Sequence, residues 1–157
     1  MQSYTTLWGA RSGGGAFATG TVQAASVLLL GRILLGSIFV LSGWGKLMGL
    51  AAFTASLARS GVPAPQALAV VGACVEFFGG LAVVLGLWAH LAALLMVAFV
   101  VVATLISHRF WEFEGAQRAM QQTNFMKNVA IIGGLLVLSL AGGGRLALDA
   151  ALTRRRA

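Results

Sequence analysis

The chain has few charged residues and few of the residue types that build reactive sites. Only 10% of its 157 residues are charged, and only four are acidic. Ordinary soluble domains contain about 25% charged residues, so a water-soluble fold is excluded. The one cysteine, Cys74, excludes an intramolecular disulfide and dithiol redox chemistry within the chain. The two histidines, His90 and His108, lie about 27 Å apart if they share one helix, so they cannot ligate the same haem iron.

Several other kinds of site are also missing from the sequence. No group of cysteine, histidine and carboxylate residues has zinc or iron spacing, and there is neither a glycine-rich nucleotide loop nor a nucleophile elbow. The net charge of +7 comes from residues at segment ends and from the arginine run 154–156, which is typical of contact with anionic lipid headgroups. No basic surface with interleaved aromatic residues indicates nucleic acid. We therefore expect no metal and no nucleic-acid partner.

Long apolar runs fill most of the chain. Hydrophobic residues make up 59% of it, and 21 residues are glycine. A helix needs about 20 mostly apolar residues to cross a bilayer. The runs cover residues 26–50, 67–87, 88–108 and 124–142. They predict an all-α integral membrane protein, an antiparallel bundle of four spanning helices that pack through glycine-bearing faces.

The remaining segments are short. Residues 1–25 are rich in Gly, Ser, Thr and Ala, which favours a loosely ordered leader, and residues 145–157 form a basic tail. The connection 51–65 is expected to hold a short amphipathic helix, and residues 108–123 are expected to form a polar loop. Four spans place both termini on the same side, and the arginines of the tail favour the cytoplasm for that side.

Glu76 is the residue most costly to bury. It lies near the middle of the second run, about 15 Å from either end of a helix. A bare carboxylate at that depth costs at least about 2.5–3.5 kcal/mol. In the first run, Arg32 and Lys46 share one sector of the helix with Gly36 and Gly43. This pattern predicts a structural ion pair between Glu76 and either Arg32 or Lys46.

A second polar group lies at the ends of the third and fourth runs, on the same side of the bilayer as Lys46. Its members are His108, Asn124, Lys127 and Asn128. We expect them to converge with Lys46 and Glu76 on a half-buried polar pocket. The expected aromatic walls are Trp44, Phe77, Phe110, Trp111 and Phe125. Purely structural interpretations stay open, because the ion pair can fix helix register and the lysines can extend to the lipid headgroups.

Four short motifs lie in order along these runs. They are Arg32-Ile-Leu-Leu-Gly36 with Ser42-Gly43 and Lys46-Leu47, Glu76 with Gly79-Gly80 and Leu85-Gly86-Leu87, Phe125-Met-Lys127-Asn128 with Gly133-Gly134-Leu135, and Gly144-Arg145 with Leu148-Asp149. Together they resemble the DoxX family over residues 28–149. The resemblance implies a small four-helix membrane protein of bacteria or archaea. Founding members of that family are associated with thiosulfate:quinone oxidoreductase or a terminal quinol oxidase, and others with oxidative-stress complexes.

The resemblance and the polar pocket together predict a membrane subunit of a redox complex in the bacterial cytoplasmic membrane. It would interact with membrane quinone and a partner oxidoreductase, with Glu76 as a catalytic proton relay. The predicted quinone-binding residues are Lys46, His108, Asn124, Lys127 and Asn128. The chain has no redox group of its own, so a partner or a reduced sulfur substrate would supply electrons. Two alternatives stay open: a non-catalytic scaffold for a partner protein, and a small-solute transporter, which would require a homo-oligomer.

Overall fold

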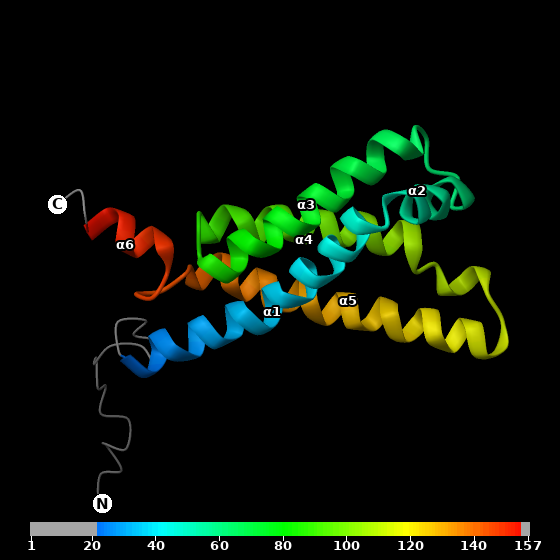
Figure 1. The fold of residues 1–157 in the computed structure, drawn as a ribbon. Coiled ribbons are helices and arrows are strands. Elements are labelled where there is room, and N and C mark those ends of the chain that lie inside the picture. Colours follow the sequence, from blue (N-terminus) through cyan, green and yellow to red (C-terminus); the bar gives the residue numbers. More distant parts are fainter. Residues whose placement is uncertain (1–21, 155–157) are drawn as a thin grey trace, which may run out of the picture.

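A computed structural model describes residues 22–154 of the chain (Figure 1). The elements in chain order are α1 (Val22–Met48), α2 (Leu50–Arg59), α3 (Pro65–Leu85), α4 (Ala89–Ser107), the short 3₁₀ helix η1 (Phe110–Glu112), α5 (Gly115–Ala141) and α6 (Leu148–Arg154). All are helices, and no strand occurs in this range, which confirms the predicted all-α class. Four are long and apolar enough to cross a membrane: α1, α3, α4 with η1, and α5.

The predicted segments match these helices except at two boundaries. Residues 22–25, which the sequence assigns to the leader, are helical, whereas residues 1–21 lie outside the described part of the chain. α5 begins at Gly115, so the prediction of a polar loop over 108–123 is wrong for most of that stretch. Its Ala, Gln, Arg and Met residues are good helix formers. Because hydropathy detects only the apolar part of a helix, the polar first turns of α5 gave no signal.

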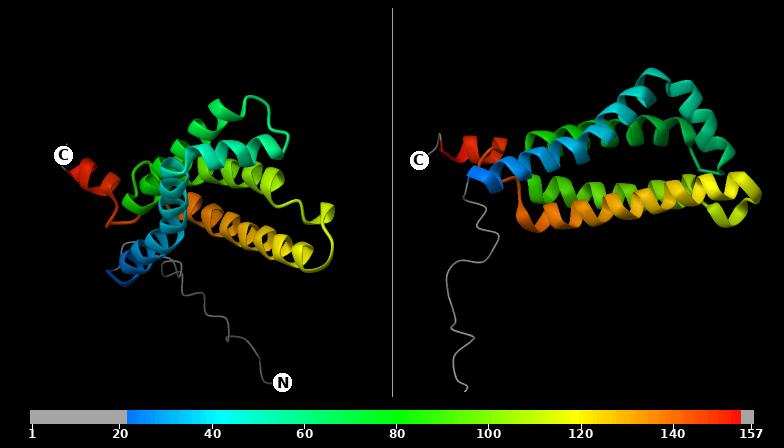
Figure 2. Two further views of the ribbon diagram at one scale, coloured as in Figure 1. Left: turned by 45° about the vertical axis from the view of Figure 1, so that its right-hand side comes forward. Right: turned by 90° about the horizontal axis from the view of Figure 1, so that it is seen from below.

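The long helices form two pairs (Figure 2). α1 packs against α3, and α4 packs against α5, while the tight α3–α4 turn joins the pairs. The predicted helix in the connection after α1 is present as α2 and packs on α3. α1 and α5 contact each other far less than either contacts its own partner. This α1–α5 seam is therefore the open side of the bundle.

The two ends of the bundle differ in what they carry (Figure 1). The start of α1, the α3–α4 turn and α6 lie at one end, called here the terminal end. α2 and η1 lie at the other, called the loop end. The two ends of the described chain thus lie on the same side of the four long helices, as an even number of spans requires.

Glycines let α1 and α3 approach closely. A Cβ placed at Gly43 would lie 2.6 Å from the backbone nitrogen of Phe77, and one at Gly36 would lie 2.9 Å from the carbonyl oxygen of Gly80. Of the two adjacent glycines in α3, Gly80 faces α1, where a Cβ would lie 2.6 Å from that of Phe39. Gly79 instead packs against Met96 of α4.

We expect Gly43→Ala to destabilise the fold by about 1–3 kcal/mol, because the added methyl group collides with the backbone of α3. The matched control is Gly45→Ala in the same helix, where an added Cβ meets nothing within 4 Å. Thermal unfolding of the purified proteins in one detergent measures the difference. Equal melting temperatures for the two variants would contradict close packing of α1 on α3.

The segment after α5 folds back onto the α3–α4 turn. Asp149 accepts hydrogen bonds from the backbone N–H groups of Trp88, at 2.9 Å, and Ala89, at 3.0 Å. These are N–H groups at the start of α4, which have no partner within their own helix. The carboxylate also lies at the positive end of the helix dipole. The predicted basic tail therefore includes a packed helix cap, while its residues 155–157 lie outside the described range.

Candidate functional site

A polar cavity of about 310 Å³ lies in the loop-end half of the bundle. α1, α2 and α5 line it together with α3 and α4. Its polar residues are Ser42, Lys46, Ser56, Glu76, Ser107, His108, Lys127 and Asn128. Five of the six residues expected in the pocket therefore meet here, although they come from α1, α3, α5 and the residue that follows α4.

An ion pair between α1 and α3 occupies the centre of this set. Lys46 donates a hydrogen bond from Nζ to Oε2 of Glu76. The Glu76 side chain is 7% exposed, whereas that of Lys46 is 31% exposed. The Lys46 ammonium also lies 5.1 Å from the ring centroid of Phe53, within the range of a cation–π interaction. The cavity thus has a buried carboxylate whose ammonium partner is open to a ligand.

Arg32 does not take part in this pair, although the sequence left it as a possible partner. It lies at the terminal end, 1% exposed, and donates a hydrogen bond from Nη2 to the carbonyl oxygen of Leu146 at 3.0 Å. Helix register explains the difference. Gly36 faces Gly80 and Gly43 faces Phe77, which brings Glu76 level with Lys46. The same register leaves Arg32 about 21 Å from Lys46 along the helix axis, beside the end of α3.

Asn128 and His108 are held in place by neighbouring polar groups. Asn128 donates a hydrogen bond from Nδ2 to Oγ1 of Thr104 at 2.8 Å, and this hydroxyl donates to the carbonyl oxygen of Val100. Nδ1 of His108 lies 2.8 Å from Oε1 of Gln121. Thr104 and Gln121 therefore position the cavity residues of α4 and α5. In the sequence, Thr104 lies four residues before His108, which places both on one face of a helix. This spacing is the sequence signal that Thr104 belongs to the polar group.

Lys127 lines the cavity, but Asn124 does not. Nζ of Lys127 donates a hydrogen bond to Oδ1 of Asn124 at 3.2 Å, within the first exposed turns of α5. The expectation that Asn124 lines the pocket is therefore wrong. The two residues are three positions apart and share a helix face, so Asn124 can accept a hydrogen bond from Lys127. Of the two, only Lys127 lines the cavity.

The aromatic walls also differ from the predicted ones. None of the five predicted rings lines the cavity, whose aromatic residues are Phe39, Phe53 and Phe99. Trp44 and Phe77 pack on each other with ring centroids 5.9 Å apart. The other three predicted rings, Phe110, Trp111 and Phe125, form a separate cluster at the loop end. Composition alone could not place these rings, because the rotation of each helix about its own axis decides which ring faces the cavity.

The remaining reactive residue types lie apart from the cavity. Cys74 is half-buried on α3 and does not line it. His90 lies near the start of α4, where its Nδ1 is 2.6 Å from the carbonyl oxygen of Ser139. Within residues 22–154, no three His, Cys, Asp or Glu side chains are grouped so that they could hold a metal ion. The cavity therefore presents hydrogen-bonding groups, a carboxylate and positively charged side chains.

Comparison with known proteins identifies the relatives of this chain. The family model described as DoxX matches residues 27–109, a range that includes Lys46, Glu76 and His108. Inner membrane protein YphA of Escherichia coli (strain K12) is 31% identical over 78% of this chain and 88% of its own length. Inner membrane protein YqjF of the same organism is 33% identical over 82% of this chain and 93% of its own length. No solved structure matches the chain. With a family match over more than half of its residues, the chain belongs to the DoxX family.

Proposed function

We propose that the polar cavity binds the head group of a membrane quinone, and that the protein is the membrane subunit of a redox complex. The observation that carries this proposal is the Lys46–Glu76 ion pair in one cavity with His108, Lys127 and Asn128. A cavity of about 310 Å³ is at the small end of the usual range for ligand sites, which suits a single ring system.

The lining matches the chemistry of a quinone head. A quinone has two carbonyl oxygens that accept hydrogen bonds, and Lys46, Lys127 and Asn128 carry N–H donors. Phe39, Phe53 and Phe99 supply apolar walls for the ring.

Reduction of a quinone to a quinol consumes two electrons and two protons. The Glu76 carboxylate can take up and release a proton, and its bond to Lys46 places it inside the cavity. The single cysteine cannot cycle as a dithiol. The electrons therefore come from a partner oxidoreductase or from a reduced sulfur substrate. In this role the chain binds the quinone and supplies protons, and its partner supplies the redox centre.

The variant Lys127→Met tests this function. Losing a charged hydrogen-bond donor should weaken binding of a tailless benzoquinone or naphthoquinone head by about 1.5–3 kcal/mol, roughly 10- to 150-fold. The control is Arg118→Met, which removes a positive charge from the same helix outside the cavity lining. Binding is followed by calorimetry on protein in nanodiscs.

Two results would contradict the proposal. One is equal affinity of the Lys127→Met variant and the unaltered protein. The other is purification of the protein with a tightly bound protein partner but with no affinity for either quinone head. The second result favours a membrane scaffold, in which the buried charges set helix register only.

The names of the relatives support a place in the bacterial inner membrane. The arginines of the tail favour a cytoplasmic terminal end, which places the polar cavity toward the outer face.

We expect a cysteine introduced at Leu152, in a Cys74→Ala background, to resist a membrane-impermeant thiol reagent in spheroplasts. A cysteine at Gln122 should react. Both positions are exposed in the structure, so labelling at Leu152 alone would show the opposite orientation.

A further inference from the structure

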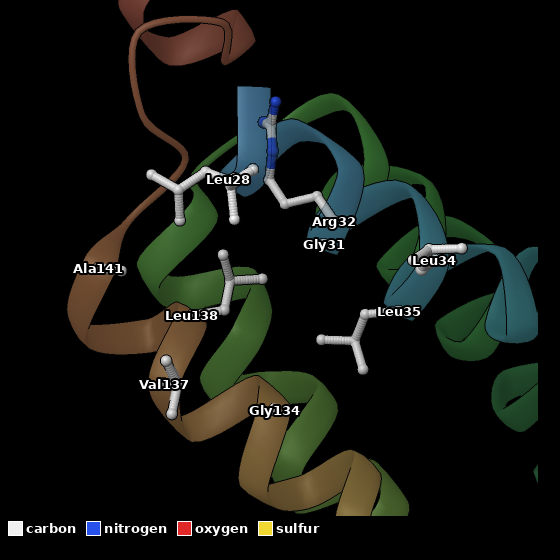
Figure 3. Close-up of a pocket in the computed structure, with 10 residues that line it drawn as sticks. Leu28, Gly31, Arg32, Leu34, Leu35, Gly134, Val137, Leu138 and Ala141 are labelled. Carbon is white, nitrogen blue, oxygen red and sulfur yellow. The ribbon is translucent and has the colours of Figure 1, made fainter. Parts of the chain in front are cut away.

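The bundle has an apolar groove as well as the polar cavity, and the two differ in what they can recognise. The groove, of about 460 Å³, lies in the terminal half of the α1–α5 seam (Figure 3). Leucine, valine, alanine and glycine residues line it together with Arg32, whose guanidinium points away from Gly134. A hydrocarbon surface of this kind gives no directional contacts. Selection of a ligand by hydrogen bonds therefore depends on the polar cavity at the loop end.

The ring of His108 has one nitrogen held by the protein and one left for a ligand. Nδ1 lies 2.8 Å from Oε1 of Gln121. A neutral imidazole has one N–H donor and one acceptor nitrogen, and an amide oxygen only accepts. The proton of neutral His108 therefore lies on Nδ1, which leaves Nε2 as an acceptor. His108 lines the cavity and Gln121 does not, so Nε2 is the nitrogen available to a ligand there.

The neighbouring Asn128 is oriented by the same kind of argument. The backbone carbonyl oxygen of Val100 only accepts, so the Thr104 hydroxyl donates to it. That hydroxyl then accepts from Nδ2 of Asn128 at 2.8 Å, which leaves Oδ1 of Asn128 for another partner. The α4–α5 side of the cavity therefore presents acceptor atoms from two residues, in addition to the ammonium donors of the lysines.

We infer that Gln121 is a positioning residue that holds His108 as a hydrogen-bond acceptor, so that the ligand contacts His108 through an O–H or N–H group and not through a carbonyl oxygen. This inference rests on the proposed function in placing a ligand in the cavity, whereas the tautomer of His108 does not depend on which ligand binds. A ring with carbonyl groups gains such hydroxyls when it is reduced, so contact with His108 favours the reduced form. The inference also gives a role to the polar first turns of α5, because they carry Gln121.

Nitrogen NMR on protein in nanodiscs reads the tautomer directly. At mildly alkaline pH, where a histidine side chain is ordinarily neutral, its bare nitrogen resonates far downfield of its N–H nitrogen. The chain contains two histidines, so labelled histidine in protein freed of any histidine tag gives a simple spectrum, and the His90→Gln variant assigns it. His90 is the internal reference, because its Nδ1 lies 2.6 Å from the backbone carbonyl oxygen of Ser139, which no substitution at Gln121 removes.

His108 of the unaltered protein should carry its proton on Nδ1. Gln121→Leu removes the acceptor, so a large share of the molecules should carry the proton on Nε2 instead. Gln121→Glu keeps an acceptor oxygen and should keep the proton on Nδ1. The matched control is Gln122→Leu, the same change at the next residue, which is exposed, and it should leave His108 unaltered. An unchanged His90 signal in each variant shows that the protein is folded.

Phenol and its methyl ether, anisole, then test the acceptor. Each has a single ring, but phenol has an O–H group to donate and anisole has none. Phenol should move the Nε2 signal of His108 upfield, as a hydrogen bond to a bare nitrogen does, and anisole should not. His90 lies outside the cavity lining and controls for phenol that is merely dissolved in the lipid.

A proton on Nε2 of His108 in the unaltered protein overturns the inference, and so does a Gln121→Leu variant that keeps the proton on Nδ1. A change of tautomer in Gln122→Leu as large as that in Gln121→Leu overturns the role of this hydrogen bond. Equal phenol shifts at His90 and His108, or none at His108, overturn the contact with a ligand hydroxyl. Failure of the proposed function gives a different result, in which the benzoquinone head does not bind but the tautomer and the phenol shift are as expected.

Discussion

Lys46→Met is expected to destabilise the protein by about 3–5 kcal/mol, which is the usual cost of leaving one member of a buried ion pair alone. Glu76 is only 7% exposed, and without Lys46 its carboxylate loses its ammonium partner. Leaving a buried charge unpaired costs free energy. Thermal unfolding and the monodisperse fraction in detergent measure the loss.

The double variant Lys46→Met with Glu76→Gln provides the control, because it removes both charges. We expect it to recover most of the lost stability, as replacement of whole buried ion pairs usually does. If the single and double variants melt at the same temperature, the charges of the ion pair contribute nothing to the stability of the fold. The folded double variant also separates two roles of the pair: loss of quinone binding supports a ligand site, and full retention of binding leaves helix register as its role.

Gly86→Ala is expected to cost about 2–5 kcal/mol, for two reasons that add together. Gly86 ends α3 with φ +67°, a left-handed conformation that costs other residues about 1–2 kcal/mol. A Cβ there would also overlap Nη1 of Arg32 and lie 2.7 Å from Cβ of Ala147, which adds an overpacking cost of about 1–3 kcal/mol. The buried Arg32 cannot move aside without losing its hydrogen bond to Leu146.

Gly61→Ala isolates the first of these costs. Gly61 has a similar φ of +73°, but an added Cβ there meets nothing within 4 Å. Its destabilisation should therefore stay near about 1–2 kcal/mol, the backbone cost alone. Melting temperatures of the two variants in the same detergent give the comparison. A Gly86→Ala variant no less stable than Gly61→Ala would contradict the packing of Arg32 against the end of α3.

The sequence was most informative where burial carries a high cost. The cost of burying a carboxylate in an apolar helix indicated that Glu76 needs an ion-pair partner. The apolar runs predicted α1, α3, α4 and α5. The choice between Lys46 and Arg32 needed the register of α1 on α3, which depends on which of two adjacent glycines, Gly79 or Gly80, turns toward α1. The glycine pattern allows both.

Other contacts between distant segments left no signal in the sequence. Asp149 caps a helix that begins 60 residues earlier, although in the chain it lies in the first turn of a different helix, α6. The aromatic walls were missed for a related reason, since Phe53 reaches the cavity only because α2 turns back across α3. Composition indicates that such residues are available, and only the packing of the helices shows where they lie.

The cap made by Asp149 also constrains the order in which the protein can be completed during synthesis. The first three spans leave the ribosome before Asp149 has been translated, so the start of α4 enters the membrane with its N–H groups uncapped. Arg32 likewise emerges long before Leu146, whose carbonyl oxygen is its hydrogen-bond partner. Residues 146–149 therefore close the terminal end only after all four spans have been made, and a chain released before Leu146 contains all four spans but cannot complete either contact.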